Sequence, residues 1–288
     1  MHSGRRKAVP DVHAMSALTE QPPTHSTVRV QRWIDGRLEQ ASDQVAEEQP
    51  VALVYLGLPH VVMLATPADL ADLGVGFSLS EAIVGGPADI RALQVLPADG
   101  GMEVRIDIPG ERLAALLQRQ RNLSGRSGCG LCGVETIAQA IRRPAPVGAG
   151  DAISSTELHA ALAELSTRQP LNAQTGSVHA AGWALPGRGL QLVREDVGRH
   201  NALDKVLGAL VRAGLDPASG YLVITSRASY EMVLKAATLG VTLLAAVSAP
   251  TALAIRLAFE TGLTLVGFAR ADRHVIYAHP QRLLPDGR

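Results

Sequence analysis

Hydrophobic and polar residues alternate in short runs through roughly the first third of the chain, a pattern typical of strands joined by tight turns. Alternation over residues 28–34, followed by Asp35-Gly36, predicts a β-hairpin. Two more strand pairs are predicted, the first around a Gly57-Leu58-Pro59 turn. These pairs cover residues 51–56 with 60–65 and residues 90–96 with 102–108.

Two helices are predicted among these strands. Thr66 and Pro67 resemble the N-cap and the first residue of a helix, with Asp69 in its first turn. A second helix is expected over residues 111–121. Residues 28–121 are therefore predicted to form a small β-rich α+β domain.

The pattern changes after residue 150 to short apolar strands that alternate with helices. Ser154 and Glu157 form a capping-box pattern that predicts the first helix start. The predicted strands cover residues 177–185, 190–194, 221–225, 242–247, 263–268 and 274–277, and the clearest helices cover 201–213, 229–239 and 250–261, with Pro250 at the first helical position of the last. This alternation predicts a layered α/β domain over residues 151–288 with a partly parallel sheet.

Two segments are expected to lie outside these domains. Residues 1–27 are rich in Pro, Ser, Thr, His and Gln and are expected to form a disordered tail. Residues 122–150 should contain a flexible loop with a C-x-x-C motif, a short helix over 134–143 and a Pro- and Gly-rich connector.

Composition narrows the class of protein. The chain of 288 residues is 47% hydrophobic and carries 27 basic and 27 acidic residues, which does not indicate a nucleic-acid or membrane partner. It contains no apolar run of membrane-spanning length, and no apolar run of signal-peptide length follows its basic N-terminus. We therefore expect a cytoplasmic protein.

The two cysteines, Cys129 and Cys132, are the only ones in the chain and have glycines on both sides and between them. Upstream arginines and a following helix N-terminus should lower the pKa of a thiol. Such a pair can cycle as a dithiol, provide half of a metal site, or carry sulfur as a persulfide. A zinc site needs two more ligands, and no second cysteine pair or close histidine pair is present.

Two enzyme classes, zinc deaminases and thioredoxin-like oxidoreductases, also contain a C-x-x-C motif. Zinc deaminases combine H-x-E with P-C-x-x-C, but His200-Asn201-Ala202 lacks the glutamate and the C-x-x-C lies upstream of the α/β domain. Neither deamination nor zinc is therefore expected. A thioredoxin-like dithiol oxidoreductase remains an alternative, although its motif normally follows a strand rather than a helix.

Polar residues follow several predicted strands of the α/β domain, where ligands commonly bind. Two of these stretches precede helix N-termini, which favour anions. The alternative is that Arg199 and His200 only cap or pair at a helix start, with Asp204 and Lys205 on a solvated face, and that His179 is an ordinary polar strand residue. The candidate ligand-binding residues are His179, Arg199, His200, Asn201, Ser226, Arg227, Arg270, Asp272 and Arg273.

Seven stretches within residues 28–283 together resemble the formate dehydrogenase accessory sulfurtransferases, the FdhD/NarQ family. The most specific is R-E-D-V-G-R-H-N-A-L-D-K-V-L-G (194–208), which accompanies S-G-C-G-L-C-G (127–133). The others are A-T-P-A-D-L-A-D-L-G-V-G-F-S-L-S-E (65–81), T-G-S-V-H-A-A (175–181), T-S-R-A-S-Y-E-M-V-L-K-A (225–236), V-S-A-P-T-A-L-A (247–254) and L-V-G-F-A-R (265–270).

The resemblance implies a sulfur carrier that takes persulfide sulfur from a cysteine desulfurase. It would deliver this sulfur to the molybdenum cofactor, bis(molybdopterin guanine dinucleotide), of formate dehydrogenase. It further implies a persulfide on Cys129, a supporting role for Cys132, a cytidine-deaminase-like fold without the zinc site, and a homodimer. The cofactor-binding motif by resemblance is Phe268, Ala269, Arg270, Ala271, Asp272 and Arg273.

The chain departs from the family pattern at Ala82 and Ala271, where glycine is expected. A function from another class also remains possible, namely a non-catalytic chaperone for the molybdoenzyme or its cofactor with redox-sensing cysteines.

Overall fold

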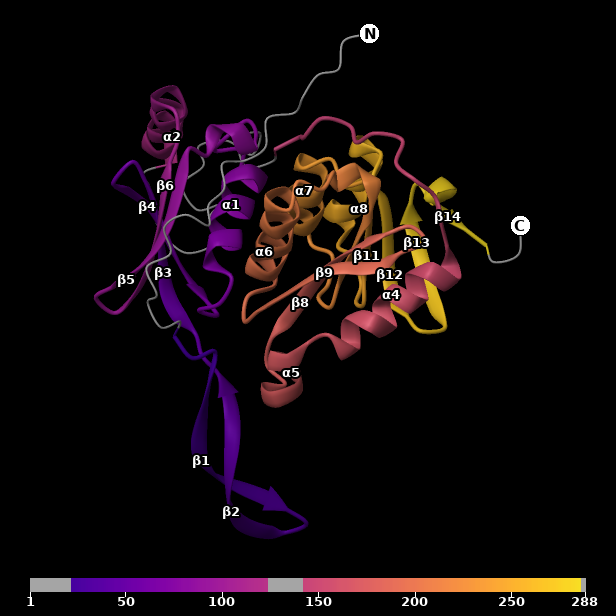
Figure 1. Cartoon of the computed structure of the whole chain (residues 1–288). Helices are drawn as coiled ribbons and strands as arrows, with labels where there is room; N and C mark the ends of the chain where they lie inside the picture. The colour runs from indigo at the N-terminus through magenta and orange to yellow at the C-terminus, as the bar shows by residue number, and fades with distance from the viewer. Residues whose placement is uncertain (1–21, 124–141, 286–288) are drawn as a thin grey trace.

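The computed structural model describes residues 22–123 and 142–285, and within it the chain forms two main sheets and a separate hairpin (Figure 1). One sheet has four strands in the order β4-β3-β6-β5, and the other has six in the order β13-β12-β11-β10-β8-β9. The mixed α/β class expected from the sequence is confirmed. No helix in these two ranges is long and apolar enough to cross a bilayer.

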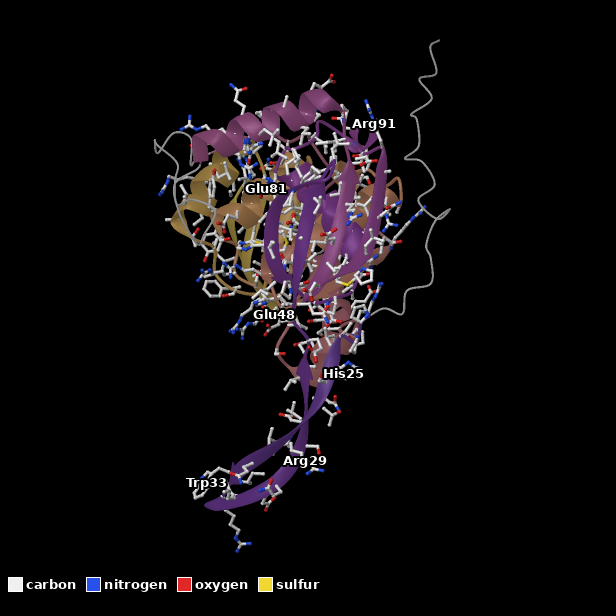
Figure 2. All side chains as sticks on the ribbon, turned by 90° about the vertical axis from the view of Figure 1, so that its left-hand side faces the viewer. His25, Arg29, Trp33, Glu48, Glu81 and Arg91 are labelled. Atoms are coloured by element: carbon white, nitrogen blue, oxygen red, sulfur yellow. The ribbon has the colours of Figure 1, made fainter. Side chains whose placement is uncertain are left out.

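The hairpin of β1 (His25–Ile34) and β2 (Arg37–Ala46) projects from the rest of the molecule (Figures 1 and 2). Its turn uses left-handed backbone at Asp35 (φ 48°) and Gly36 (φ 81°), which confirms the Asp-Gly prediction. Residues 25–27, which were expected in the tail, are the first residues of β1. The side chain of Trp33 near the tip is 71% exposed.

The four-stranded sheet is made of the two predicted strand pairs, with one register correction. The turn between β3 and β4 lies at Leu56 and Gly57, both with positive φ, so Leu58 and Pro59 belong to β4 rather than to the turn. The bounds are β3 (Gln49–Tyr55), β4 (Leu58–Ala65), β5 (Ala92–Ala98) and β6 (Gly101–Asp107), with helices α1 (Leu70–Ser80) and α2 (Gly110–Leu123).

The predicted start of the first helix at Thr66-Pro67 is wrong. Helix α1 begins at Leu70, and its N-cap is Asp69 in a left-handed conformation. Thr66 instead binds across the molecule, because its backbone N–H donates to Asp196 and its hydroxyl accepts from the backbone N–H of Val197. These long-range bonds replace a capping role.

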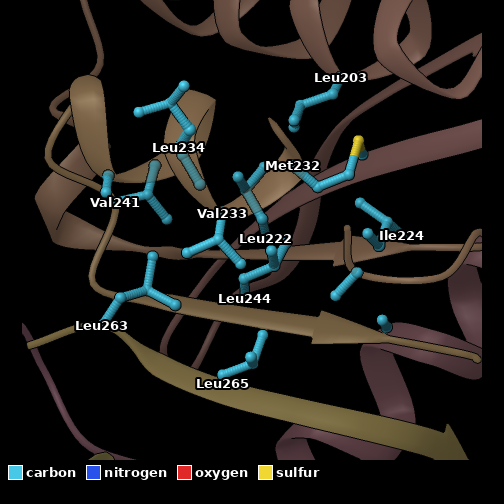
Figure 3. Close-up of a cluster of buried hydrophobic side chains, with 14 of the residues drawn as sticks. Leu203, Leu222, Ile224, Met232, Val233, Leu234, Val241, Leu244, Leu263 and Leu265 are labelled. Atoms are coloured by element: carbon cyan, nitrogen blue, oxygen red, sulfur yellow. The ribbon is translucent and has the colours of Figure 1, made fainter. Parts of the chain in front are cut away.

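The six-stranded sheet is the centre of a three-layer α/β arrangement. Strands β10, β11 and β12 are parallel, and β8, β9 and β13 extend the sheet with antiparallel pairs. One face packs against α6, α7 and α8 (Figure 3), and the other packs against α4. The bounds are β8 (His179–Leu185), β9 (Gly189–Asp196), β10 (Tyr221–Ile224), β11 (Leu243–Ala246), β12 (Thr264–Arg270), β13 (Arg273–Ala278), α4 (Ser155–Thr167), α6 (Arg199–Arg212), α7 (Tyr230–Thr238) and α8 (Ala252–Thr261).

Helix starts in this region show where local patterns suffice. The capping box of Ser154 and Glu157 is present at α4, as predicted. Pro250 is not the first residue of α8: Thr251 is the N-cap, and Pro250 forms an isolated bridge with Ala228. A short helix α5 (Pro170–Thr175) and a small pair of strands, β7 (Ile153–Ser154) with β14 (Leu283–Leu284), were not predicted.

Helices α1 and α6 join the two sheet systems through a close crossing at Gly76 and Gly208. Beside the crossing, the buried carboxylate of Asp72 pairs with Arg194 and Arg212. The crossing therefore places the end of α1 against the α/β layers.

Candidate functional site

The polar stretches predicted to bind a ligand do lie along one edge of the six-stranded sheet. The start of β8 and the end of β9 meet there, since His179 and Asp196 are register partners. The carboxyl ends of the parallel strands β10, β11 and β12 lie at the same edge, and residues 225–229 and 268–273 follow two of them. The structure therefore places these polar stretches at one edge of the sheet.

The strand order divides the candidates into two groups. Residues 196–201 follow β9 at one side of the sheet, whereas residues 268–273 join β12 to β13 at the other. Strands β9 and β12 are four positions apart, which corresponds to roughly 19 Å at the usual spacing. One small ligand cannot contact both groups, but an elongated one can.

In the first group, Arg199 and His200 open helix α6. Gly198 is the N-cap and provides no side-chain cap, so the N-terminal backbone donors remain available to an acceptor. Nε2 of His200 lies 2.9 Å from a carboxylate oxygen of Glu231 in α7. Nε of Arg199 is a buried atom with no hydrogen-bond partner among the described residues.

His179 faces this cationic group. Burial, followed by the positive charges of Arg199 and His200, lowers the pKa of His179 below its ordinary value of 6.5. His179 is therefore neutral in the folded chain at neutral pH, and an anion bound nearby would oppose the shift.

Asn201 has a structural role in this arrangement. Its amide nitrogen donates to the backbone oxygen of Leu64, at 2.8 Å, and to Asp196, at 3.0 Å. Asp196 is itself fully buried against Lys205, with 2.6 Å between the charged atoms. Asn201 thus holds α6 against β4 and has less capacity for a ligand than Arg199.

The N-terminus of α7 lies at the same edge. Ser229 is its N-cap but makes no capping hydrogen bond, and its buried hydroxyl has no partner in the described part of the chain. Ser226 is buried and donates to the backbone oxygen of Arg227, whose side chain is exposed. Ser229 lies in a stretch that the sequence singled out, and its missing cap identifies it as a further candidate.

The second group surrounds the turn between β12 and β13. Phe268 has a left-handed backbone (φ 49°) and is 42% exposed, an unusual combination for an aromatic residue. Ala269 is fully buried in the hydrophobic layer, so only its backbone could contact a ligand. The remaining four candidates are exposed, namely Arg270, Ala271, Asp272 and Arg273.

Cys129 and Cys132 lie outside the described residues, as do positions 134–141 of the predicted helix. The described residues on either side, Arg119 and Arg142, converge on Glu81. Arg142 donates to the Glu81 carboxylate at 2.7 Å, and Arg119 donates to the Glu81 backbone oxygen at 3.3 Å.

Beneath Glu81 lies a buried charged cluster that the sequence analysis missed. Lys235 is 5% exposed and binds Asp204, Glu81 and the hydroxyl of Ser80. The interpretation of Asp204 and Lys205 as a solvated face is wrong, since both are buried and ion-paired, Asp204 with Lys235 in α7 and Lys205 with Asp196 at the end of β9. The rarity of lysine could have indicated this cluster. The chain contains only three lysines, and two of them, Lys205 and Lys235, are buried here.

Comparison with known proteins gives a consistent result. A sequence profile of the FdhD/NarQ family matches residues 46–284. Proteins named sulfur carrier protein FdhD are similar over nearly the whole chain. The one from Cupriavidus necator is 53% identical, and the match covers 95% of each chain. The one from Xanthomonas campestris pv. campestris is 55% identical, and the match covers 92% of this chain and 96% of the relative. A crystal structure from Desulfotalea psychrophila, described as a formate dehydrogenase accessory protein, has a TM-score of 0.72 at 25% identity and covers 91% of this chain and all of its own.

Proposed function

Because the chain belongs to the FdhD/NarQ family, we propose that it carries sulfur from a cysteine desulfurase to the molybdenum cofactor of formate dehydrogenase. The cofactor is bis(molybdopterin guanine dinucleotide), bound as cargo. The strongest structural support is the sheet edge, where two helix N-termini lack a side-chain cap and buried polar atoms have no partner among the residues that the structure describes.

This edge fits an elongated anion. Backbone donors at the start of α6 and α7, with Arg199 and Ser229 beside them, suit phosphate or other oxyanions. The turn between β12 and β13 offers Arg270 and Arg273 for phosphate oxygens and the exposed ring of Phe268 for a purine face. The distance between the two groups suits a dinucleotide better than a mononucleotide.

Sulfur loading is a thiol exchange. The Cys129 thiolate attacks the terminal sulfur of the donor's cysteine persulfide, a new S–S bond forms, and the donor's S–S bond breaks. The donor leaves as a thiolate and Cys129 keeps the persulfide, so no external oxidant or reductant is needed. Cys132 serves as a second thiol that can accept or release this sulfur.

We infer three further properties for the same protein. The layered domain is cytidine-deaminase-like without the zinc site, as the family resemblance implies, and it does not deaminate, because the α6 start reads His200-Asn201-Ala202 and lacks the catalytic glutamate. The chain acts in the cytoplasm, where thiols remain reduced. It acts as a homodimer, as the family resemblance implies.

Persulfide mapping tests the sulfur-transfer step. After incubation with a desulfurase and cysteine, mass spectrometry should find one added sulfur on Cys129. Cys129→Ala should lose that adduct, whereas Cys132→Ala should keep it on Cys129. Full sulfur loading of the Cys129→Ala chain would overturn the assignment.

Nucleotide binding tests the cofactor site separately. GDP is the probe, and its affinity should fall roughly tenfold or more in the Arg270→Ala/Arg273→Ala double variant, because charged hydrogen bonds to phosphate are lost. Arg256→Ala, at an exposed position of α8, is the matched control and should bind GDP as the unchanged chain does. Equal affinity in the double variant would remove this site.

A further inference from the structure

Glu81 lies directly after helix α1, and three cationic side chains surround it. One carboxylate oxygen lies 2.7 Å from Arg142 and the other 2.9 Å from Lys235. The Arg119 guanidinium donates to the backbone oxygens of Glu81 and Ala82, at 3.3 and 3.4 Å. These carbonyls lie at the C-terminal end of a helix, where the backbone attracts cations.

The two arginines come from opposite sides of one chain segment. Cys129 follows Arg119 by ten residues, and Cys132 precedes Arg142 by ten residues. Ten residues span at most about 34 Å when fully extended, so the attachment points set the reach of both cysteines. Glu81 is contacted by the described residues at both of these points.

The positive charges of Arg119 and Arg142 explain why a carboxylate is favourable at position 81. Burial and the positive charge of the nearby Arg142 lower the pKa of Arg119, because both disfavour a second guanidinium charge at this point. Burial alone would raise the pKa of Glu81, but Lys235 and Arg142 outweigh it and lower the pKa. Glu81 is therefore ionised and offsets the repulsion.

The inner side of this junction is rigid. Lys235 is buried, binds both carboxylate oxygens of Asp204 at 2.9 and 3.1 Å, and lies 5.2 Å from the ring centroid of Phe77. Ser80 donates to Asp204 at 2.7 Å. Glu81 is thus bonded to the junction of α1, α6 and α7, in the part of the body near α2 and opposite the hairpin (Figure 2).

Arg142 has a second contact with the body, through its backbone rather than its side chain. The hydroxyl of Tyr230, in α7, donates to the backbone oxygen of Arg142 at 2.8 Å. The next residue, Arg143, pairs with the half-exposed Glu260, at 3.5 Å. The tie through Glu81 therefore differs from the weak surface pair beside it.

We propose that Glu81 is a positioning residue that holds the cysteine-bearing segment at one point on the protein body, through its carboxylate to Arg142 and its backbone oxygen to Arg119. This inference rests on the proposed sulfur transfer, because it assigns Glu81 to the handover of sulfur rather than to its loading. A donor protein can reach the cysteines wherever the segment lies. Handover to the bound cofactor requires a restricted path, and loosening one end lowers the local concentration of the persulfide at its target.

The first test measures position without relying on function. A spin label on Cys129 in a Cys132→Ser chain is paired with a second label at Arg256→Cys, and the distance distribution is recorded. Glu81→Gln should broaden the distribution, whereas Glu260→Gln, the matched control, should leave it unchanged. An unchanged distribution in a folded Glu81→Gln chain would overturn the proposal.

The second test separates loading from handover. In the Glu81→Gln chain, Cys129 should acquire sulfur to the normal level. Cells that carry this variant should nevertheless show formate dehydrogenase activity reduced roughly tenfold or more. Equal maturation would overturn the proposal. If Glu81→Gln does not fold, Arg142→Gln breaks the same tie from its more exposed side and decides the question.

The two proposals fail in different ways. If the unchanged chain acquires no sulfur on Cys129, the proposed sulfur transfer is wrong, and the label distances still report whether Glu81 is the anchor. If sulfur is acquired normally and the label distances do not respond to Glu81→Gln, only the anchor is wrong.

Discussion

Gly76 of α1 and Gly208 of α6 face each other so closely that a β-carbon on either would overlap the backbone of the other helix. The added carbon at Gly76 would clash with the carbonyl oxygen of Asp204, and that at Gly208 with the carbonyl oxygen of Asp72. Backbone atoms cannot rotate away as a side chain can. This contact sets the position of Glu81, at the end of α1, against Lys235.

Gly208→Ala should therefore destabilise the protein strongly. We expect the free energy of unfolding to fall by about 3 kcal/mol, at the upper end of overpacking effects, since both helices must move apart. Urea unfolding monitored by circular dichroism measures the change. Gly110→Ala, at the start of α2 with no atom near the added carbon, is the control and should change stability little. A mild effect at Gly208 would contradict the close crossing.

At Ala82 and Ala271, where the family pattern has glycine, substitution by glycine should change the free energy of unfolding in opposite directions. Ala82 has a left-handed backbone (φ 52°), so Ala82→Gly should relieve about 1 kcal/mol of backbone strain and raise the free energy of unfolding. Ala271 is not among the described residues with positive φ, so Ala271→Gly should only loosen the turn and lower stability by up to about 1 kcal/mol. Urea midpoints compare them, and destabilisation by Ala82→Gly would contradict its assigned conformation.

The two tryptophans report on opposite environments. Trp33 is 71% exposed on the hairpin, and Trp183 is fully buried in β8. Trp33→Phe should leave blue-shifted emission that resists acrylamide and should change the free energy of unfolding by no more than about 0.5 kcal/mol. Trp183→Phe should leave red-shifted, readily quenched emission and cost about 1–3 kcal/mol. Shielded emission from Trp33 would mean that the hairpin is covered in solution.

Short sequence motifs correctly predicted the turns and helix starts that are stabilised by neighbouring residues. The hairpin turn at Asp35-Gly36 and the capping box at Ser154 need only neighbouring residues, and both are present. Shared placement of the ligand loops at one sheet edge also followed, because parallel strands end on the same side.

The errors involve residues whose partners are distant in sequence. Thr66 looks like a helix cap, but it binds Asp196 and Lys205, which lie 130 and 139 residues further along. Lys205 looks solvated for the same reason. Which loop residues point outward was also not predictable, since Ala269 lies in the buried layer while its neighbours are exposed. The contacts of Thr66 and Lys205 depend on how distant parts of the chain pack together, and the burial of Ala269 depends on the packing around β12. No local pattern encodes either.

His179 provides a pH-dependent measure of the strand-end site. Its pKa in the folded chain lies below 6.5, whereas the unfolded chain binds the proton at about the ordinary value. The stabilising contribution is therefore present above pH 6.5 and is lost as the pH falls from there through the lower pKa of the folded chain. His179→Gln should remove this part of the pH dependence between about pH 8 and pH 5, as urea unfolding can show.

The same histidine can detect an anion at the start of α6. Because Arg199 and His200 help to lower its pKa, a bound phosphate that offsets their charge should raise the pKa of His179 toward 6.5. Nuclear magnetic resonance titration of His179 with and without inorganic pyrophosphate measures this shift. Arg199→Gln should raise the pKa without ligand and reduce the further response, since one source of the positive field is removed. If saturating pyrophosphate leaves the pKa of His179 unchanged, the anion does not bind at α6, and the proposed site for the cofactor's phosphates is reduced to the β12–β13 turn.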